Sequence, residues 1–173
     1  MVWFNDLMKY VVTGGPCSGK TSVIEVLETK GYRIIEEAAR LVIKNGNVFP
    51  WVDLGKFQDA ILKKQLELEK SLEGDIMFLD RGLIDGVAYY KFANIKMPDE
   101  LVMVCKENRY DKVFLLDMLV TYESDLERKE DEGTAERIHR LVKESYEEFN
   151  YKIIEVPVMD VEERVKFILE NVD

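Results

Sequence analysis

Residues 14–21 match the pattern G-x-x-x-x-G-K-[ST], which is typical of loops that bind nucleotide phosphates. In such a loop, backbone N–H groups converge at a helix N-terminus, where the helix dipole also favours negative charge. Lys20 is then expected to reach the β- and γ-phosphates, and the Thr21 hydroxyl is expected to bind Mg²⁺. The pattern therefore predicts binding of Mg²⁺ and a nucleoside triphosphate, taken here as ATP. The predicted nucleotide contacts are Gly15, Pro16, Cys17, Ser18, Gly19, Lys20 and Thr21.

Acidic side chains follow two of the apolar runs that read as strands. Asp80 ends one of them, where its carboxylate can hold Mg²⁺ directly or through water, or cap the next helix. Glu36 and Glu37 end another, and either can accept the proton of an acceptor hydroxyl. An ion pair with Arg40 on a helix surface explains these two glutamates equally well. Asp85 can face the acceptor or simply stabilise the dipole of its own helix.

Arginines are the candidate groups for stabilising the charge of a transferred phosphoryl group. Arg81 directly follows the Asp80 carboxylate. Arg128 lies in the charged segment 117–133, which is predicted as a lid that closes over the phosphates and excludes water. Arg137 and Arg140 are alternative lid arginines. A solvated loop is the plainer interpretation of most of this charge.

Aromatic residues and the single histidine complete the candidates. Phe49 and Trp51 lie in a loop, and Tyr89 and Tyr90 lie in a helical segment. Their rings can stack on an acceptor ring or belong to the core. His139 has no neighbours that suggest a metal site or a catalytic triad, so it is predicted to lie on the surface.

The chain alternates between segments with strand and helix patterns. A strand precedes the phosphate loop and a helix follows it, which is the context that the motif requires. Such alternation needs right-handed crossovers and predicts an α/β fold with three layers, in which helices cover a five-stranded parallel sheet. Ligands of such sheets bind at the carboxyl ends of the strands. The predicted strands are 10–13, 32–35, 75–80, 111–116 and 151–156, and the predicted helices are 20–27, 36–44, 56–72, 84–94, 98–107, 134–149 and 161–172.

Composition restricts the class of protein. The 173 residues suit a single domain, 1–173. A net charge of -10 opposes binding to nucleic acid or to anionic membranes. No apolar run approaches the ~20 residues that span a bilayer, and no signal peptide is evident. Two cysteines make neither a disulfide framework nor a metal site. We therefore expect a cytoplasmic protein whose partner is a small molecule.

The motifs together resemble the small AAA-type, kinase-like P-loop domains. That group includes the ribosylnicotinamide kinase domain of a bifunctional NAD-biosynthesis protein, and it is more distantly similar to nucleoside and nucleotide kinases. The resemblance implies that Glu36 or Glu37 lies near the acceptor, Asp80 near Mg²⁺ and Arg128 in the lid. It rests on the segments 14–21, 36–40, 78–90, 122–128 and 151–157.

These residues predict transfer of the γ-phosphoryl group of Mg·ATP to a nucleoside- or nucleotide-like acceptor, by positioning and charge stabilisation. A first alternative is a regulatory ATPase or GTPase switch without an acceptor. The absence of an Asn-Lys-x-Asp sequence weakens the GTPase version. A second alternative is a binding domain with a degenerate site, against which the intact Lys20, Thr21 and Asp80 count.

Overall fold

A single parallel sheet forms the centre of the molecule. The computed structural model describes residues 7–46, 48–70, 76–119 and 132–172. Within them, five strands pair in the order β2-β3-β1-β4-β5, and every pair is parallel. The predicted fold class is thus confirmed. The strands are β1 (Met8–Thr13), β2 (Arg33–Ile35), β3 (Ile76–Asp80), β4 (Lys112–Leu116) and β5 (Ile153–Val156).

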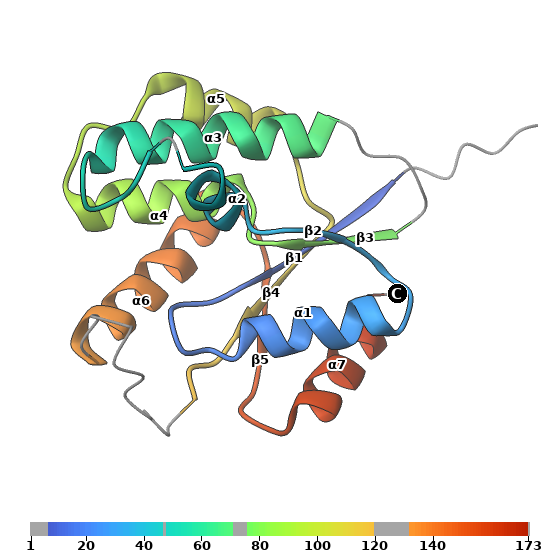
Figure 1. The fold of residues 1–173 in the computed structure, drawn as a ribbon. Coiled ribbons are helices and arrows are strands. Elements are labelled where there is room, and N and C mark those ends of the chain that lie inside the picture. The colour runs from blue at the N-terminus through green and yellow to red at the C-terminus, as the bar shows by residue number, and fades with distance from the viewer. Residues whose placement is uncertain (1–6, 47, 71–75, 120–131, 173) are drawn as a thin grey trace, which may run out of the picture.

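Helices cover both faces of this sheet, as Figure 1 shows. One face packs against α1 (Lys20–Thr29) and α7 (Val161–Glu170). The other packs against α4 (Leu83–Ala93), α5 (Asp99–Glu107) and α6 (Glu132–Glu148). The long helix α3 (Leu54–Lys70) packs against α4 and against the short helix α2 (Ala38–Lys44). None of the helices in the described ranges is long and apolar enough to cross a membrane.

Two apolar clusters hold the three layers together. Successive strand residues point to opposite faces, so Tyr10 and Phe78 belong to the cluster under α1 and α7. Val11 and Leu79 belong to the cluster under α4 and α6. Burial on both faces explains why the strands read as continuous apolar runs rather than as alternating ones.

The main difference from the predicted elements concerns the segment after β2. The predicted helix started at Glu36, whereas α2 starts at Ala38 and Glu37 is its N-cap residue. Glu37 has ψ near 115°, which is not helical. The two glutamates therefore belong to the turn at the carboxyl end of β2, where a side chain can face the site. Asp75, residues 71–72 and most of the predicted lid, including Arg128, lie outside the described residues.

Phe78 tests the contribution of the core under α1 and α7. Its ring is fully buried between the rings of Tyr10 and Tyr32, at centroid distances of 5.5 and 5.4 Å. We expect Phe78→Ala to lower the free energy of unfolding by about 3–5 kcal/mol, measured by urea denaturation, because it leaves a cavity. Met103→Ala is the control: Met103 is 59% exposed, and a change there should stay within about 0.5 kcal/mol. Equal effects of the two variants would contradict this account of the core.

Candidate active site

The phosphate loop runs from the end of β1 to the start of α1. Three of its residues have positive φ: Gly14 (153°), Cys17 (60°) and Gly19 (74°). The next residue, Lys20, is buried, and its Nζ lies 2.7 Å from Oδ1 of Asp80. Because Val12 of β1 pairs with Asp80 of β3, the two predicted motifs end at the same point of the sheet edge. Asp80 therefore projects from the tip of its strand beside Lys20, where the sequence predicts it.

The charge of Lys20 depends on its neighbours. Burial lowers its pKa most, and the nearby Arg81 guanidinium lowers it further. The carboxylates of Asp80 and Glu37 act in the opposite direction but do not cancel this effect. An additional anion beside Lys20, such as a phosphate, would stabilise the ammonium form.

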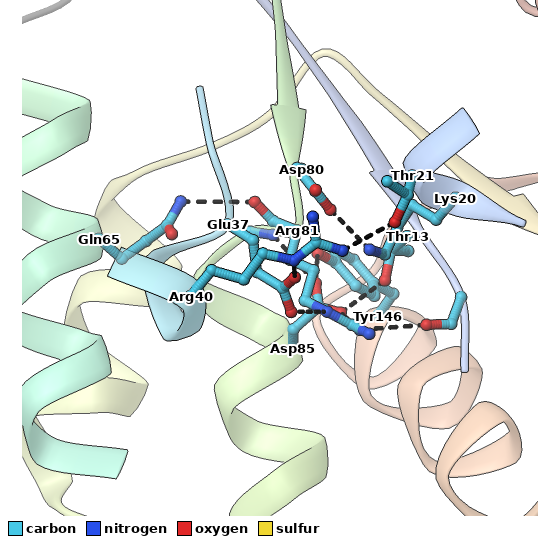
Figure 2. Close-up of polar contacts among 12 residues, drawn as sticks. Thr13, Lys20, Thr21, Glu37, Arg40, Gln65, Asp80, Arg81, Asp85 and Tyr146 are labelled. Atoms are coloured by element: carbon cyan, nitrogen blue, oxygen red, sulfur yellow. Dashed lines mark hydrogen bonds and ion pairs between the residues drawn. The ribbon is translucent and has the colours of Figure 1, made fainter. Parts of the chain in front are cut away.

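Arg81 is the centre of a network of charged side chains, shown in Figure 2. Its Nε donates to Oε1 of Glu37 at 3.0 Å, and its Nη1 donates to Oδ1 of Asp85 at 2.9 Å and to the carbonyl of Gly14 at 3.0 Å. The backbone of Arg81 has φ of 72°, which is unusual for a residue with a side chain. These contacts support that conformation and direct the guanidinium toward the phosphate loop.

Asp85 orients the Arg81 guanidinium through an ion pair. Its carboxylate is buried and also accepts hydrogen bonds from Thr13 Oγ1 at 2.5 Å and from Tyr146 Oη at 2.7 Å. The Gly82 N–H donates to it at 3.0 Å, as in a helix capping box. Asp85 thus caps the N-terminus of α4 and also lines the cavity beside the site, so its position is compatible with both of the roles predicted for it. Its contacts make it a group that orients Arg81.

Glu37 and Arg40 extend the network to the helix α1. Arg40 Nε lies 2.9 Å from Oε2 of Glu37, and its Nη2 donates to Oγ1 of Thr21 at 2.7 Å. The ion pair that was considered for this segment is thus present, with Glu37 rather than Glu36 as the partner. Glu36 is exposed and forms no ion pair with any residue that the structure describes.

The same contacts set the acidity of Glu37. Burial would raise its pKa, but the positive charges of Arg81, Lys20 and Arg40 outweigh burial, and the net effect is a lowered pKa. The side chain of Glu37 is therefore a carboxylate at neutral pH, hydrogen-bonded to guanidinium groups through both oxygens.

Two residues of the site fit a magnesium ion. Mg²⁺ prefers oxygen ligands, and it commonly takes one or two from the protein and the rest from phosphates and water. The Thr21 hydroxyl and the Asp80 carboxylate are ligands of this kind, at the two sides of Lys20. A metal at Thr21 would share the hydroxyl oxygen with Arg40 or displace that guanidinium. In the described ranges, no three His, Cys, Asp or Glu side chains cluster as a metal site.

Helix α6 contacts the phosphate loop, which the sequence did not indicate. His139 was predicted to lie on the surface, but it is only partly exposed, and its Nδ1 accepts a hydrogen bond from the Gly15 N–H at 3.2 Å. Burial lowers the pKa of His139, which favours the neutral ring that can accept this bond. Arg137 lies over the Phe92 ring, and Arg140 is exposed near Glu144. Neither arginine contacts the phosphate loop.

A cavity of about 300 Å³ opens beside this network. Glu37, Arg81 and Asp85 line it together with Gln58 and Gln65, and most of the other lining side chains are apolar. Tyr89 and Tyr90 line it, and Tyr90 is also a buried member of the core under α4 and α6, so the structure shows features of both interpretations of these rings. The cavity wall also includes Phe57, Gln58, Ile61, Leu62, Gln65, Leu83, Phe92, Leu101 and Ile138.

The two loop aromatics behave differently from those tyrosines. Phe49 and Trp51 stack on each other with ring centroids 4.9 Å apart, and Trp51 is 73% exposed. Neither forms the cavity wall, although Pro50 between them does.

Several residues of the site were not singled out by sequence reasoning. Thr13 is a polar residue at the end of an apolar strand, and Gln58 and Gln65 lie on the inner side of α3. Arg164 shares the apolar face of α7 with Val161, Val165 and Ile168, at i, i+3, i+4 and i+7 spacing. A charge in that position is a signal that could have been read.

Comparisons with known proteins place this geometry in a family. A family model described as an AAA domain matches residues 9–164. The chain therefore belongs to that family, and its motifs show it to be a P-loop member. No curated protein matches the sequence significantly.

Solved structures of kinases share the fold. Deoxyadenosine kinase from M. mycoides with bound dATP is 19% identical, with a TM-score of 0.65 over 95% of this chain and 99% of that one. NadR protein in complex with NR is 15% identical, with a TM-score of 0.71 over 94% of this chain and 49% of that one. Thymidylate kinase from Ehrlichia chaffeensis is 13% identical, with a TM-score of 0.65 over 96% and 99%. At these identities the similarity concerns the fold.

Glu37 gives a prediction for the pH dependence of stability. Its lowered pKa means that the ionised form stabilises the folded protein above the ordinary value of 4.5, and this contribution is lost as the pH falls through the folded pKa. At neutral pH we expect Glu37→Gln to lower the free energy of unfolding by about 1–3 kcal/mol. The difference from wild type should shrink below pH 4.5.

Urea denaturation at several pH values measures this difference. Glu36→Gln is the matched control, since its exposed carboxylate has no ion pair in the described chain. Its stability should follow that of wild type at every pH. Parallel curves for the two variants would show that Glu37 is not stabilised by its guanidinium partners.

Proposed function

We propose that this protein is a small-molecule kinase, which transfers the γ-phosphoryl group of ATP to a nucleoside- or nucleotide-like acceptor. One observation carries the proposal: Arg81 pairs with Glu37 at the wall of a largely apolar cavity and also donates to the Gly14 carbonyl of the phosphate loop, whose Lys20 is paired with Asp80. The phosphate loop, as the donor site, and the cavity, as the acceptor site, would therefore adjoin each other at Arg81. The kinase folds found among the solved structures support the same class of reaction.

Each residue has a role that follows from its position. Lys20 and the loop N–H groups would bind the β- and γ-phosphates. Arg81, which is held by Asp85, would stabilise the charge on the phosphoryl group during transfer. Glu37 at the cavity wall would accept the proton of the acceptor hydroxyl and orient it for attack. Asp80 and Thr21 would hold Mg²⁺, which when bound neutralises phosphate charge.

Glu37 is suited to orientation more than to strong basicity. Its pKa is lowered, so the carboxylate is ionised but is a weak base in this arrangement. Phosphoryl transfer has a largely dissociative transition state, in which the acceptor proton leaves late and positioning matters most. The geometry is thus compatible with this chemistry. Residues 117–133 would form the lid proposed for the site, with Arg128 in it.

The cavity wall favours an acceptor with an amide-like edge. Gln58 is 4% exposed and lines the cavity, but its carboxamide forms no hydrogen bond with any residue in the described ranges. A ligand with one donor and one acceptor side by side would pair with this carboxamide at the cavity wall. Nucleobases have such edges, and their flat rings suit walls made of Phe57 and Tyr89.

A screen for the reaction tests the kinase proposal. Purified protein with Mg·ATP would be offered nucleosides, nucleotides and vitamin-like alcohols, and phosphorus NMR would identify a new ester. We expect one acceptor class to consume ATP stoichiometrically. Glu37→Gln should lower kcat by about 10²–10⁴-fold, as is usual for loss of an acid–base group.

The control for this variant is again Glu36→Gln, which should keep the wild-type kcat. ATP hydrolysis that no acceptor accelerates would instead support the nucleotide-dependent switch. Loss of ATP binding in Lys20→Ala is expected under both functions, so this variant tests the donor site alone.

Gln58→Leu separates acceptor recognition from folding. We expect the acceptor KM to rise about 10–100-fold, because a hydrogen-bonded partner of the acceptor is lost, while the KM for ATP stays unchanged. The free energy of unfolding should stay equal or rise, since no hydrogen bond within the described residues is lost and an apolar side chain of similar size takes the place of the amide.

Gln65→Leu is the matched comparison. Gln65 Nε2 already donates to Glu69 Oε1 at 2.8 Å and to the Arg81 carbonyl at 3.4 Å. Its replacement should therefore lower stability, which thermal unfolding would report. An unchanged acceptor KM in Gln58→Leu would refute the role given to Gln58.

A further inference from the structure

Arg164 is a buried cation whose guanidinium binds backbone carbonyls, and in the described ranges only the charge of Asp117, at longer range, acts to raise its pKa. It lies on α7 and is 1% exposed, and no described carboxylate forms an ion pair with it. Its guanidinium donates to three backbone carbonyls: Nη1 to Ser18, Nη2 to Asp117 at 2.9 Å and Nε to Pro157 at 3.0 Å. Burial lowers the pKa of Arg164. A buried charge of this kind is costly, and core packing alone would favour an apolar residue on this helix face.

The three carbonyls belong to three different loops. Ser18 lies in the phosphate loop after β1, Asp117 follows β4, and Pro157 follows β5. All three loops leave the same edge of the sheet, because the strands are parallel. One side chain therefore links the phosphate loop to its two neighbours on that side of the site.

The contact with Ser18 determines how the phosphate loop presents its donors. In a planar trans peptide, the carbonyl and the following N–H point in opposite directions. Since the Ser18 carbonyl points to Arg164, the Gly19 N–H must point away from α7. The described chain gives that N–H no acceptor. The Leu119 N–H binds the Cys17 carbonyl at 3.1 Å, and so orients the preceding peptide in a similar way.

The Arg164 guanidinium also approaches Gly19 closely. Gly19 has φ of 74°, and a Cβ atom built on it would lie 3.4 Å from Nη1 of Arg164. The Arg164 guanidinium is thus in close contact with the Ser18–Gly19 peptide, whose carbonyl it binds. Its positive charge also lies behind the loop, where it adds to the potential that an anion would meet.

We propose that Arg164 is a positioning residue for the triphosphate of the donor nucleotide. It keeps the Ser18–Gly19 peptide in the orientation that directs the Gly19 N–H to the phosphates. This inference rests on the proposed function, because it takes the loop to be an ATP site. Arg164 itself does not touch the nucleotide.

The test compares the affinities of two probes, ATP and inorganic triphosphate, by isothermal titration calorimetry with Mg²⁺ present. Arg164→Met removes the charge and the three hydrogen bonds while keeping an unbranched side chain. We expect its affinity for both probes to fall by about tenfold or more, which corresponds to the loss of roughly one well-oriented hydrogen bond. Arg164→Lys keeps the charge and should lose less.

A purely structural role would lower thermal stability without changing the affinity of the folded protein, so both are measured at a temperature where each variant is folded. Lys166→Met is the matched control, because Lys166 is an exposed residue of the same helix. Arg164→Lys keeps the proposal testable if Arg164→Met does not fold. Wild-type affinity for inorganic triphosphate in both Arg164 variants would overturn the proposal. Wild-type protein that binds neither probe would overturn the proposed function itself.

Discussion

The buried ion pair between Arg81 and Asp85 is the interaction on which the candidate site depends. Asp85 accepts four hydrogen bonds, from Thr13, Arg81, Gly82 and Tyr146, and so connects β1, the turn after β3 and α6. Because these bonds engage both oxygens of its carboxylate, Asp85 fixes the Arg81 guanidinium, which contacts Glu37 and the phosphate loop. A buried carboxylate is tolerated when it is paired and hydrogen-bonded, as both oxygens of Asp85 are. Stability and the geometry of the site therefore rely on the same groups.

The parallel sheet explains why these groups can meet at all. Parallel strands place all their carboxyl ends at one edge, and the pairing of Val12 with Asp80 aligns β1 and β3 there. Asp80 then lies beside Lys20, although sixty residues separate them in the chain. Gly82, just beyond Arg81, allows this turn to pack closely, because a Cβ atom on it would lie 2.8 Å from the Tyr110 ring.

Patterns that act over one turn or one strand were readable from the sequence. The phosphate loop, the five strands and the carboxylate at the end of β3 follow from local composition and hydrophobic spacing. The choice between Glu36 and Glu37 was not readable, since it depends on where α2 begins and on the guanidiniums of Arg81 and Arg40. His139 was misjudged for a similar reason: its partner is a backbone N–H that lies 124 residues away in the sequence. Side chains that bind distant backbone groups leave no local pattern.

The contact between Arg164 and Ser18 joins residues 146 positions apart. During synthesis, the phosphate loop leaves the ribosome well before α7 does. The whole phosphate loop is therefore synthesised long before Arg164, the residue whose side chain binds the Ser18 carbonyl. If Arg164 shapes the loop as proposed, a truncated chain that has lost α7 would retain the nucleotide motif without the contact that orients the Ser18–Gly19 peptide.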